Sequence, residues 1–461
     1  MNKQIKNGLE HIGIWLGVFI ITAVTCIGIL YASCLIPQQR ILGNIEKSAT
    51  YFQETFLFSD AVEQVFNTKQ DNYGDCLMVG IMYQMNHSDE SLFRQSMQMA
   101  YYQEEMQNVN DGLSKAIEQN LQGNQGYYRY WHGYQSYLRP LFLFTDIQGA
   151  RIIMGIVIVL LMLATAWLLL RKGKAVLGIC YLVSFILLNG WMCFYCFNYV
   201  NMSLIMALCS FIIVCTYNEK VPLDQRKKQL FVFFTAFGIC TCFFDFLTYE
   251  TLSLTIPLVI EFVLEDNRSD FKTKCRDFIK YGIAWGCAYA AMFLLKWFIS
   301  VVMFGTQAWI HIWDSASERI NGTVYMGSTN LDSEVDFVAR MTQAITKNIS
   351  VMMPFKAEMN ANLGVVYFGI FLVACILISY LFRSDDFEIE SVGVLILLAL
   401  IPYLRYLVLS NHAYLHYFFT YRAQMVTVLV ILYITLEYGL GDVIHHKNKG
   451  IQNKSQKNKR K

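Results

Sequence analysis

The segment LFVFFTAFGICTCFFDFLTYETLSLTIPLVIEFVL, residues 230–264, is longer than one membrane crossing, which takes about 20 apolar residues. Asp245 and Glu250 interrupt its middle, where charge in a membrane is costly. The basic stretch DQRKK precedes it and NRSDFKTKCR follows it. Because basic connectors stay in the cytoplasm, both ends lie on the inner side and the segment crosses an even number of times. We therefore predict a hairpin of two helices that turns at FDFLTYE, residues 244–250.

The rest of the chain is also far more apolar than a soluble protein. Hydrophobic residues make up 55% of it and charged residues 16%, whereas soluble domains carry about 25% charged residues. Apolar runs predict one helix each at residues 12–36, 152–170, 283–304, 365–382, 392–409 and 425–440, and the run 175–217 is long enough for two. The fold class that follows is an all-α membrane protein with about ten transmembrane helices in a lipid bilayer.

The distribution of Lys and Arg predicts which side of the membrane each connector faces. The connectors 171–174, 218–228 and 267–280 are rich in Lys and Arg, whereas the turns near Asn198 and Thr248 have none. Both termini are then cytoplasmic, and we expect a bacterial plasma membrane. The predicted layout is a cytoplasmic N-terminus (1–11), a first transmembrane helix (12–36), a large extracytoplasmic loop (37–151), transmembrane helices 2–7 (152–304), a second extracytoplasmic loop (305–364), transmembrane helices 8–10 (365–440) and a basic cytoplasmic tail (441–461).

The first extracytoplasmic loop contains two helical candidates. SLFRQSMQMAYYQEEMQNV, residues 91–109, places apolar and aromatic residues at three- and four-residue spacing, which predicts an amphipathic helix along the membrane surface. DNYGDCLMVGIMYQ, residues 71–84, places Asp71 and Asp75 four residues apart. If a helix begins near Asp71, both carboxylates lie on one side of its positive end. Two interpretations stay open: Asp71 caps the helix, or the acids are catalytic.

The aromatic stretch YYRYWHGYQSYLRP, residues 127–140, leads from this loop into the next apolar run. Aromatic side chains suit the headgroup layer, so a membrane-interface belt explains several of them. A belt needs no arginine, however, and Arg129 and Arg139 offer planar guanidinium groups that hold a phosphate in bidentate fashion. His132 lies between them, and Trp131 and Tyr134 can stack on sugar rings. The stretch predicts binding of a lipid with an anionic, sugar-bearing head group.

Ionisable residues at membrane depth predict a polar cavity near the outer surface. Asp245, Arg405 and Lys296 interrupt apolar helices, at a cost of about 2.5–3.5 kcal/mol each on insertion scales. A structural ion pair between Asp245 and Arg405 is the alternative. Tyr249 and Glu250 follow Asp245 in the hairpin turn, and we expect them to support the site.

The last outer turn, NHAYLHYFFTYRAQ at residues 411–424, adds Asn411, His412, His416 and Arg422 to the candidates. The two histidines have the i,i+4 spacing of a helical metal pair, but no acidic residue completes an HExxH motif. Hydrogen bonding to substrate hydroxyl groups or to a phosphate is the preferred interpretation, and metal ligation is the alternative.

The layout and three motifs resemble a known class of membrane enzymes. An inner N-terminus, one helix, a large acidic outer loop and then many helices resemble the GT-C superfamily of polytopic glycosyltransferases. RYWHGYQSYLRPL, FDFLTYE and NHAYLHYFFTYR are similar to bacterial membrane proteins grouped loosely with that class. The resemblance implies a polyprenyl-phosphate sugar donor and an acid of the first outer loop as general base, here Asp71 and then Asp75. A divalent cation such as Mg²⁺ or Mn²⁺ stays open, because D-N-Y-G-D departs from the D-x-D pattern.

The function expected from these features is transfer of a sugar from a polyprenyl-phosphate donor to a cell-envelope acceptor on the extracytoplasmic face. Nucleotide sugars stay in the cytoplasm, so an outward site needs a donor that a lipid has carried across. One direct attack assisted by a carboxylate base inverts the anomeric configuration. An exporter or flippase of a lipid-linked glycan, and a polymerase or ligase of surface polysaccharides, are the alternatives. The sequence has no GxxxxGK[ST] or GxGxxG motif and no basic groove, which disfavours nucleotide hydrolysis and nucleic-acid binding.

Overall fold

The hairpin predicted for residues 230–264 is present in the computed structural model, which describes residues 3–321, 337–352, 361–382 and 389–439. Its arms are α10 (Leu223–Phe244) and α11 (Leu252–Glu265). Arg226 at the start of α10 donates from Nε to Glu261 Oε1 near the end of α11 at 3.0 Å. This ion pair holds the two arms antiparallel, and the turn between them lies at the opposite end, as the sequence predicts.

Seven of the described helices are long and apolar enough to cross a membrane, and two shorter apolar helices accompany them. The seven are Gly8–Cys34, Ile147–Arg171, Asn198–Thr216, Leu223–Phe244, Phe271–Phe304, Leu363–Leu381 and Tyr417–Tyr438, and the shorter ones are Ala175–Leu187 and Val392–Val408. The helical membrane class is therefore supported, but the predicted number of ten spans is not confirmed. α11 has 14 residues, and the run 175–217 breaks at Asn189, whose left-handed φ of 54° stops the preceding helix.

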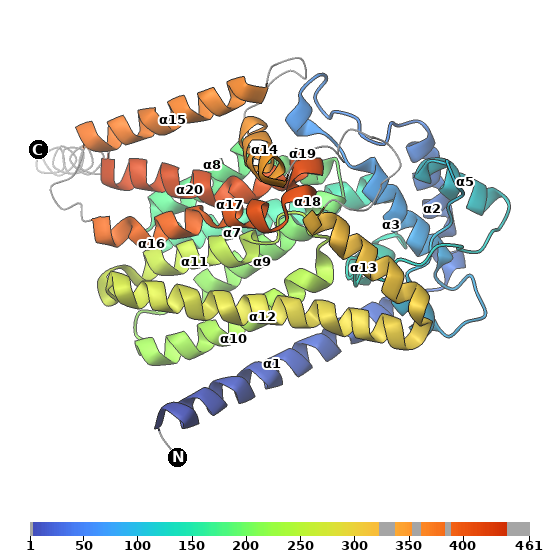
Figure 1. Cartoon of the computed structure of the whole chain (residues 1–461), viewed down its shortest axis with the longest axis horizontal. Helices are drawn as coiled ribbons and strands as arrows, with labels where there is room; N and C mark the ends of the chain where they lie inside the picture. The colour runs from blue at the N-terminus through green and yellow to red at the C-terminus, as the bar shows by residue number, and fades with distance from the viewer. Residues whose placement is uncertain (1–2, 322–336, 353–360, 383–388, 440–461) are drawn as a thin grey trace, which may run out of the picture.

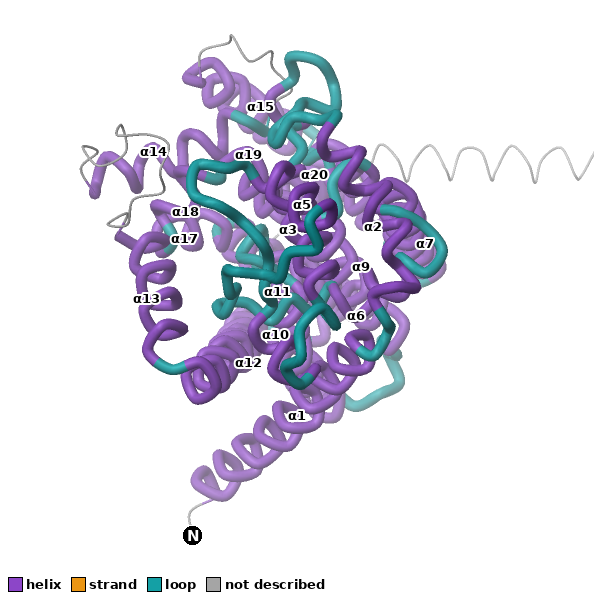
Figure 2. Tube along the Cα trace, turned by 90° about the vertical axis from the view of Figure 1, so that its right-hand side faces the viewer, coloured by secondary structure: helices purple, strands orange, loops and turns teal. Residues whose placement is uncertain are grey.

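The long helices pack side by side as a bundle (Figures 1 and 2). Besides the hairpin, it contains α1 (Lys3–Cys34), α7 (Ile147–Arg171), α8 (Ala175–Leu187), α9 (Asn198–Thr216), α12 (Phe271–Phe304), α15 (Ala361–Leu381), α16 (Ile389–Ala399), α17 (Ile401–Val408) and α20 (Met425–Ile434). Large apolar side chains such as Leu160 on α7 and Leu294 on α12 are each 60% exposed. Exposed aliphatic surface on long helices is what a bilayer solvates.

The predicted first outer loop folds into a group of short helices at one end of the bundle (Figure 1). These are α2 (Gln38–Gln53), α3 (Asn72–Gln84), α4 (Leu92–Gln98), α5 (Val109–Glu118) and α6 (Gln135–Leu141), with a 3-10 turn at Phe66–Thr68. The single amphipathic helix predicted over 91–109 is wrong. α4 ends at Gln98 because Met99 takes a φ of 50°, and the Tyr101 N–H then donates to the Gln125 carbonyl at 3.0 Å. Pairing between distant segments overrides the local periodicity here.

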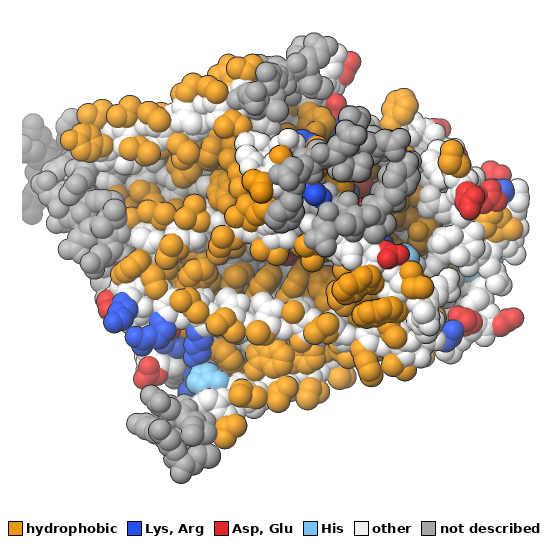
Figure 3. Space-filling model, in the orientation of Figure 1, with side chains coloured by type: hydrophobic (Ala, Val, Ile, Leu, Met, Phe, Trp, Pro, Cys, Tyr) orange, Lys and Arg blue, Asp and Glu red, His pale blue; other side chains and the backbone are white. Residues whose placement is uncertain are grey.

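Charged side chains gather at the two ends of the molecule, and hydrophobic side chains cover most of the visible face between them (Figure 3). Lys228 pairs with Glu10 at 2.9 Å and Lys227 with Asp277 at 2.7 Å. These pairs lie at the start of α1 and α10, opposite the short helices of the first loop (Figure 1). The predicted basic tail, 441–461, lies outside the described residues.

The second predicted outer loop, 305–364, contains α13 (Thr306–Asn321) and α14 (Phe337–Ser350). Residues 322–336 and 353–360 of that loop lie outside the described ranges. α13 turns back from the end of α12 toward α18 (Ser410–Leu415), which is followed by α19 (Tyr417–Thr420) and a 3-10 turn at Tyr421–Gln424 (Figures 1 and 2). Residues of both outer loops and of the last outer turn thus meet at one end of the bundle.

Candidate functional site

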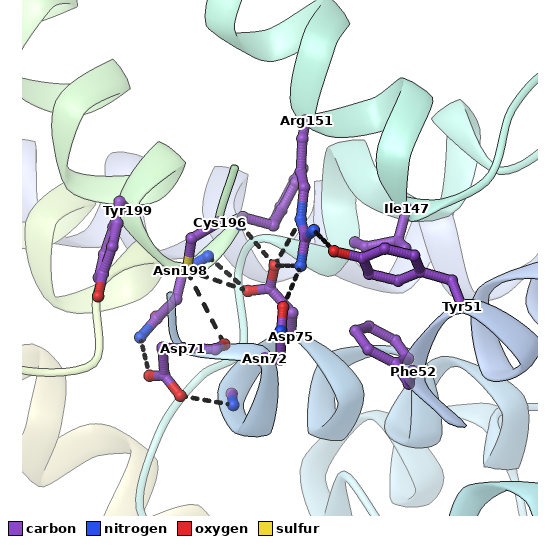
Figure 4. A network of polar contacts seen from close by, with 12 residues as sticks. Tyr51, Phe52, Asp71, Asn72, Asp75, Ile147, Arg151, Cys196, Asn198 and Tyr199 are labelled. Atoms are coloured by element: carbon purple, nitrogen blue, oxygen red, sulfur yellow. Dashed lines mark hydrogen bonds and ion pairs between the residues drawn. The ribbon is translucent and has the colours of Figure 1, made fainter. Parts of the chain in front are cut away.

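Asp75 is held in a buried ion pair (Figure 4). It is fully inaccessible, and its Oδ2 accepts from Arg151 Nε at 2.9 Å and Nη2 at 2.7 Å. The backbone N–H groups of Phe197 and Asn198, at the start of α9, donate to the same carboxylate at 2.6 and 2.7 Å. The Cys196 thiol adds a longer contact, with its Sγ 3.7 Å from Oδ1. These donors occupy both oxygens of Asp75 and hold α3, α7 and α9 together. The prediction of Asp75 as a catalytic acid is corrected, because both of its oxygens already accept hydrogen bonds.

Asp71 is the N-cap of α3, as one of the two sequence interpretations predicts. Its Oδ1 accepts from the Gly74 N–H at 2.9 Å and its Oδ2 from Asn198 Nδ2 at 2.8 Å (Figure 4). A Cβ at position 74 would approach Asp71 Oδ2 to 2.9 Å, so glycine leaves room for the cap. Burial raises the pKa of Asp71 to about 6, the Gly74 hydrogen bond opposes that shift, and the charge of Asp75 adds to it. Asp71 therefore exchanges a proton near neutral pH, which suits a general base.

Arg139 is a structural clamp between helices. It is fully buried and donates to three backbone carbonyls, those of Ser33 at 3.2 Å, Met82 at 2.7 Å and Ile36 at 2.6 Å. These carbonyls belong to the ends of α1 and α3 and to the turn after α1, where helix geometry leaves them without partners. The prediction that Arg139 and Arg129 clamp one phosphate is corrected, because the Arg139 guanidinium already donates hydrogen bonds to three backbone carbonyls.

Three further residues of the aromatic stretch face the protein interior. Trp131 is fully buried and donates from Nε1 to the Met292 carbonyl at 2.9 Å. Tyr134 is also fully buried, and its hydroxyl lies 3.1 Å from His132 Nδ1, while His132 Nε2 lies 3.3 Å from the Tyr127 carbonyl. Burial is the largest of the effects that hold the pKa of His132 well below its usual value. The predicted sugar stacking by Trp131 and Tyr134, and ligand binding by His132, are therefore corrected to packing roles.

Gly133 explains why this stretch turns inward. Its N–H donates to the Phe243 carbonyl at 2.9 Å, at the last turn of α10. A Cβ at position 133 would overlap the Phe243 ring, so only glycine permits this approach. The close contact anchors residues 127–140 beside the hairpin turn.

Arg129 faces away from that interior, toward α13. Its Nη1 donates to Ser315 Oγ and its Nη2 to Tyr127 Oη, both at 2.9 Å, and its guanidinium carbon lies 4.4 Å from the Tyr127 ring centroid. Arg319 also lies near Tyr130, with its guanidinium carbon 5.8 Å from that ring centroid. Within the described part of the chain, the Nε atoms of Arg129 and Arg319 are buried without a hydrogen-bond partner. Neither guanidinium forms an ion pair with a carboxylate of the described residues.

Arg405 pairs with Glu250, not with Asp245 as one alternative predicts. Its Nε lies 2.9 Å from Glu250 Oε1 and its Nη2 3.2 Å from Oε2, and Nη2 also donates to the Leu247 carbonyl at 2.7 Å. Asp245 instead accepts from the N–H of Thr248 at 2.9 Å and from its hydroxyl. Burial, with the nearby charge of Glu250, raises the pKa of Asp245 to about 7. Asp245 is therefore a second acid that titrates near neutral pH.

His412 lies in α18 and His416 directly follows that helix, and their ring centroids are 4.7 Å apart. Burial lowers the pKa of His416 to about 3, and the positive charges of Arg319, Arg405 and Arg129 lower it further. The same three arginines act on His412, whose pKa lies well below its usual value because of burial and His416. Both histidines are thus neutral at physiological pH. We call Arg129, Arg319, Arg405, His412 and His416 the basic cluster.

Asn411 and Arg422 adjoin this cluster. Asn411 Nδ2 donates to the Glu318 carbonyl at 2.6 Å, so it fastens α18 to α13. Arg422 is 3% exposed, and its guanidinium carbon lies 4.0 Å from the ring centroid of Tyr199. Its Nε and Nη2 have no hydrogen-bond partner among the described residues. Tyr249 donates to the Tyr199 carbonyl at 2.8 Å and so holds the hairpin turn against α9.

The pKa of Tyr73 is affected by both Asp71 and Arg129. Burial raises the pKa of the Tyr73 phenol most strongly, Arg129 lowers it, and Asp71 raises it. Both charged groups therefore lie within electrostatic range of one hydroxyl. That Asp71 and the basic cluster line one site stays a prediction of the sequence.

The described residues contain no group of three His, Cys, Asp or Glu side chains that could hold a metal ion. The carboxylate oxygens of Asp71 and Asp75 already accept hydrogen bonds from N–H groups, so the pair does not offer a free oxygen from each residue to one divalent cation. The i,i+4 pair His412 and His416 has no acidic partner in that part of the chain. Binding of Mg²⁺ or Mn²⁺ stays an open prediction of the sequence.

Arg151, Ser315 and Arg319 were not among the residues predicted from the sequence. Arg319 lies 14 residues beyond Gly305, in a helix that periodicity could have placed on the outer surface, but nothing local indicates its partner. The chain matches no family model, no curated protein and no solved structure in our comparisons.

Proposed function

We propose that the protein is a bacterial plasma-membrane glycosyltransferase. It takes a sugar from a polyprenyl-phosphate donor and passes it to a cell-envelope glycan, lipid or protein on the extracytoplasmic face. One observation carries the proposal: Arg129 and Arg319 present buried N–H groups without partners in the described ranges. Arg129 and the titratable Asp71 also both influence the pKa of Tyr73. Buried guanidinium N–H groups are costly unless an anion satisfies them.

Binding of the donor phosphate is assigned to the basic cluster. The guanidinium carbons of Arg129 and Arg319 lie 5.5 and 5.8 Å from the Tyr130 ring centroid. Arg405 lies within electrostatic range of the two neutral histidines. Fixed guanidinium groups in a water-poor site stabilise an anion more strongly than they would in water. Arg422 supplies a further guanidinium next to α9, whose Asn198 holds Asp71.

The chemical step needs one base and one stabilised leaving group. An acceptor hydroxyl attacks the anomeric carbon while Asp71 takes its proton, a glycosidic C–O bond forms, and the bond from the anomeric carbon to the phosphate oxygen breaks. The electron pair leaves with the polyprenyl phosphate, whose charge the arginines stabilise. A single displacement without a covalent intermediate inverts the anomeric configuration.

An exporter or flippase is the main alternative. Such a protein needs polar groups along the whole membrane path, whereas Arg226 and Glu261 in the inner half neutralise each other at 3.0 Å. That arrangement favours chemistry at the outer end over passage through the bundle. A polymerase or ligase of surface glycans shares the donor and the sidedness, and the acceptor distinguishes it from other transferases.

The experiment is a transfer assay with purified protein in nanodiscs. It uses a radiolabelled polyprenyl-phosphate sugar and a mixture of cell-envelope acceptors. We expect Asp71→Asn to lower transfer by at least about 100-fold, as for removal of a general base, while donor binding persists. Asp89→Asn, in an exposed part of the same loop, is the matched control. Unchanged transfer in Asp71→Asn rejects the base, and headgroup movement across liposomes without bond formation rejects the transferase.

The arginine assignment is tested in the same system. Arg129→Gln should weaken binding of a polyprenyl phosphate, whereas Arg94→Gln should not, because Arg94 is half exposed and pairs with Glu90 at 2.9 Å. Equal affinity in wild type and Arg129→Gln would remove the phosphate site from the proposal.

A further inference from the structure

Helix α13 has two faces of different chemistry. Trp309, Ile310, Trp313 and Ile320 are 48%, 54%, 58% and 47% exposed, and the two tryptophan rings stack with centroids 5.8 Å apart. Hydrophobic side chains gather over this helix in the space-filling view (Figure 3). An exposed cluster of large apolar side chains marks a surface that another apolar body covers.

The opposite face of α13 belongs to the basic cluster. Ser315 accepts from Arg129 at 2.9 Å, and Arg319 lies over Tyr130. Ala308 and Ile312 are buried in a small apolar group around Tyr128. One helix therefore separates the guanidinium groups from an exposed apolar surface.

The apolar face of α13 continues the lipid-facing surface of α12. Phe298 and Val302, four residues apart near the end of α12, are each 68% exposed. Gly305, with a φ of 69°, turns the chain directly from α12 into α13. Because α12 is a candidate membrane span, we expect its exposed side chains to contact lipid chains and the adjoining face of α13 to lie at the headgroup boundary. Tryptophan is the residue that this boundary favours.

We infer that the apolar face of α13 binds the hydrocarbon chain of the lipid whose phosphate occupies the basic cluster. The inference rests on the proposed function and adds the surface that recognises the chain. An amphiphile carries its charge and its chain next to each other, and α13 presents a matching pair of surfaces on its two sides. The ligand therefore enters from the membrane past Trp309 and Trp313, with its phosphate leading toward Arg319.

The test compares two ligands of the same charge. Full-length protein in detergent micelles is titrated with a long-chain polyprenyl phosphate and with citronellyl phosphate, which has only a short chain. We expect the Trp309→Ala/Trp313→Ala double variant to weaken long-chain binding about tenfold. It removes two indole rings that are about half exposed and that the lipid chain would cover. Binding of citronellyl phosphate should change by less than about twofold, because its chain is too short to cover both indole rings.

Two variants control for folding and for loss of tryptophan in general. Trp167→Ala removes a tryptophan that is 54% exposed on α7, and it should bind both ligands as the wild type does. Trp309→Phe/Trp313→Phe keeps the apolar face and should recover most of the long-chain affinity.

The possible outcomes separate the inference from the proposed function. Equal losses of affinity for both ligands in the tryptophan double variant, or no loss for either ligand, would overturn the role of α13. If Arg129→Gln then weakens the binding of both ligands, the assignment of the phosphate site to the basic cluster is kept and only the role of α13 is rejected. If the wild type binds neither ligand, the proposed function fails and the inference fails with it. Dissociation of a wild-type dimer by the tryptophan substitutions would identify a second copy as the occupant and also overturn the inference.

Discussion

Replacement of Asp75 by asparagine should make the protein much easier to unfold, although it exchanges only one carboxylate oxygen for an NH2 group. In the wild type, the carboxylate accepts from Arg151 at 2.7 and 2.9 Å and from two backbone N–H groups of α9. Asparagine keeps the shape but removes the charge and turns one acceptor into a donor. Arg151 is 2% exposed and would be left as a buried cation without a counter-charge.

The magnitude follows from these contacts. Removal of one partner of a buried ion pair costs about 3–5 kcal/mol of unfolding free energy. The amide group also faces the N–H groups of Phe197 and Asn198, so at least one of these donors loses its acceptor at about 1–3 kcal/mol. These terms overlap, and we expect a total near 4 kcal/mol, within the range for buried pairs.

The assay is equilibrium unfolding in mixed micelles of a mild detergent and SDS, followed by far-UV circular dichroism. Asp266→Asn is the control, because Asp266 forms an exposed pair with Lys174 at 3.1 Å, and such pairs contribute about 0–1 kcal/mol. Arg151→Met in the Asp75→Asn background should cost less than the two single changes added together, because the stranded cation is gone. A loss below about 1 kcal/mol in Asp75→Asn, or strict additivity of the two changes, would refute the structural assignment.

Four further predictions concern the site and the hairpin turn. Transfer should rise about tenfold per pH unit below pH 6 and level off above it, because Asp71 must lose its proton to act as a base; a flat pH–rate profile contradicts this. Since burial raises the pKa of Asp71 from 3.8 to about 6, the folded state favours the protonated acid, and its contribution to stability falls as pH rises through that range. Asp71→Asn keeps a capping side chain and should therefore be as stable as wild type at pH 7, or more stable by up to about 3 kcal/mol, in the same unfolding assay. Gly133→Ala should cost about 1–3 kcal/mol because its methyl group overlaps Phe243, and an unchanged unfolding midpoint would contradict that contact. Arg405→Gln should destabilise the protein by about 3–5 kcal/mol by stranding Glu250, and Glu250→Gln in the same chain should restore part of the loss.

Local features were predictable where neighbours in the sequence determine them. The hairpin turn falls between Phe244 and Leu252, as the charged interruption and the basic flanks predict. Asp71 begins α3, because aspartate at that position satisfies a free N–H group of the first turn. Helix lengths were less predictable, since Asn189 and Met99 stop helices by adopting left-handed backbone that apolar periodicity does not reveal.

The sequence did not predict which partner each charged side chain of the site would have. Asp71 and Asp75 look alike in the sequence, four residues apart and in the same helical turn. Asp75 meets Arg151, 76 residues further along the chain, and becomes structural. Asp245 and Glu250 are likewise neighbours in one turn, yet only Glu250 reaches Arg405, 155 residues away. Arg129 and Arg139 are ten residues apart, and their guanidinium groups contact Ser315 on α13 and a set of backbone carbonyls, respectively.

The sequence by itself determined that this chain is helical, that its long apolar runs suit a bilayer, and that its polar mass lies in two loops and one turn. Those properties follow from composition and spacing, because a bilayer forces each segment to satisfy its own backbone. Only the tertiary structure decided which acid stays titratable and which arginines lack a counter-charge. That choice depends on contacts between residues far apart in the chain, and burial makes each such contact strong enough to fix the role of the side chain.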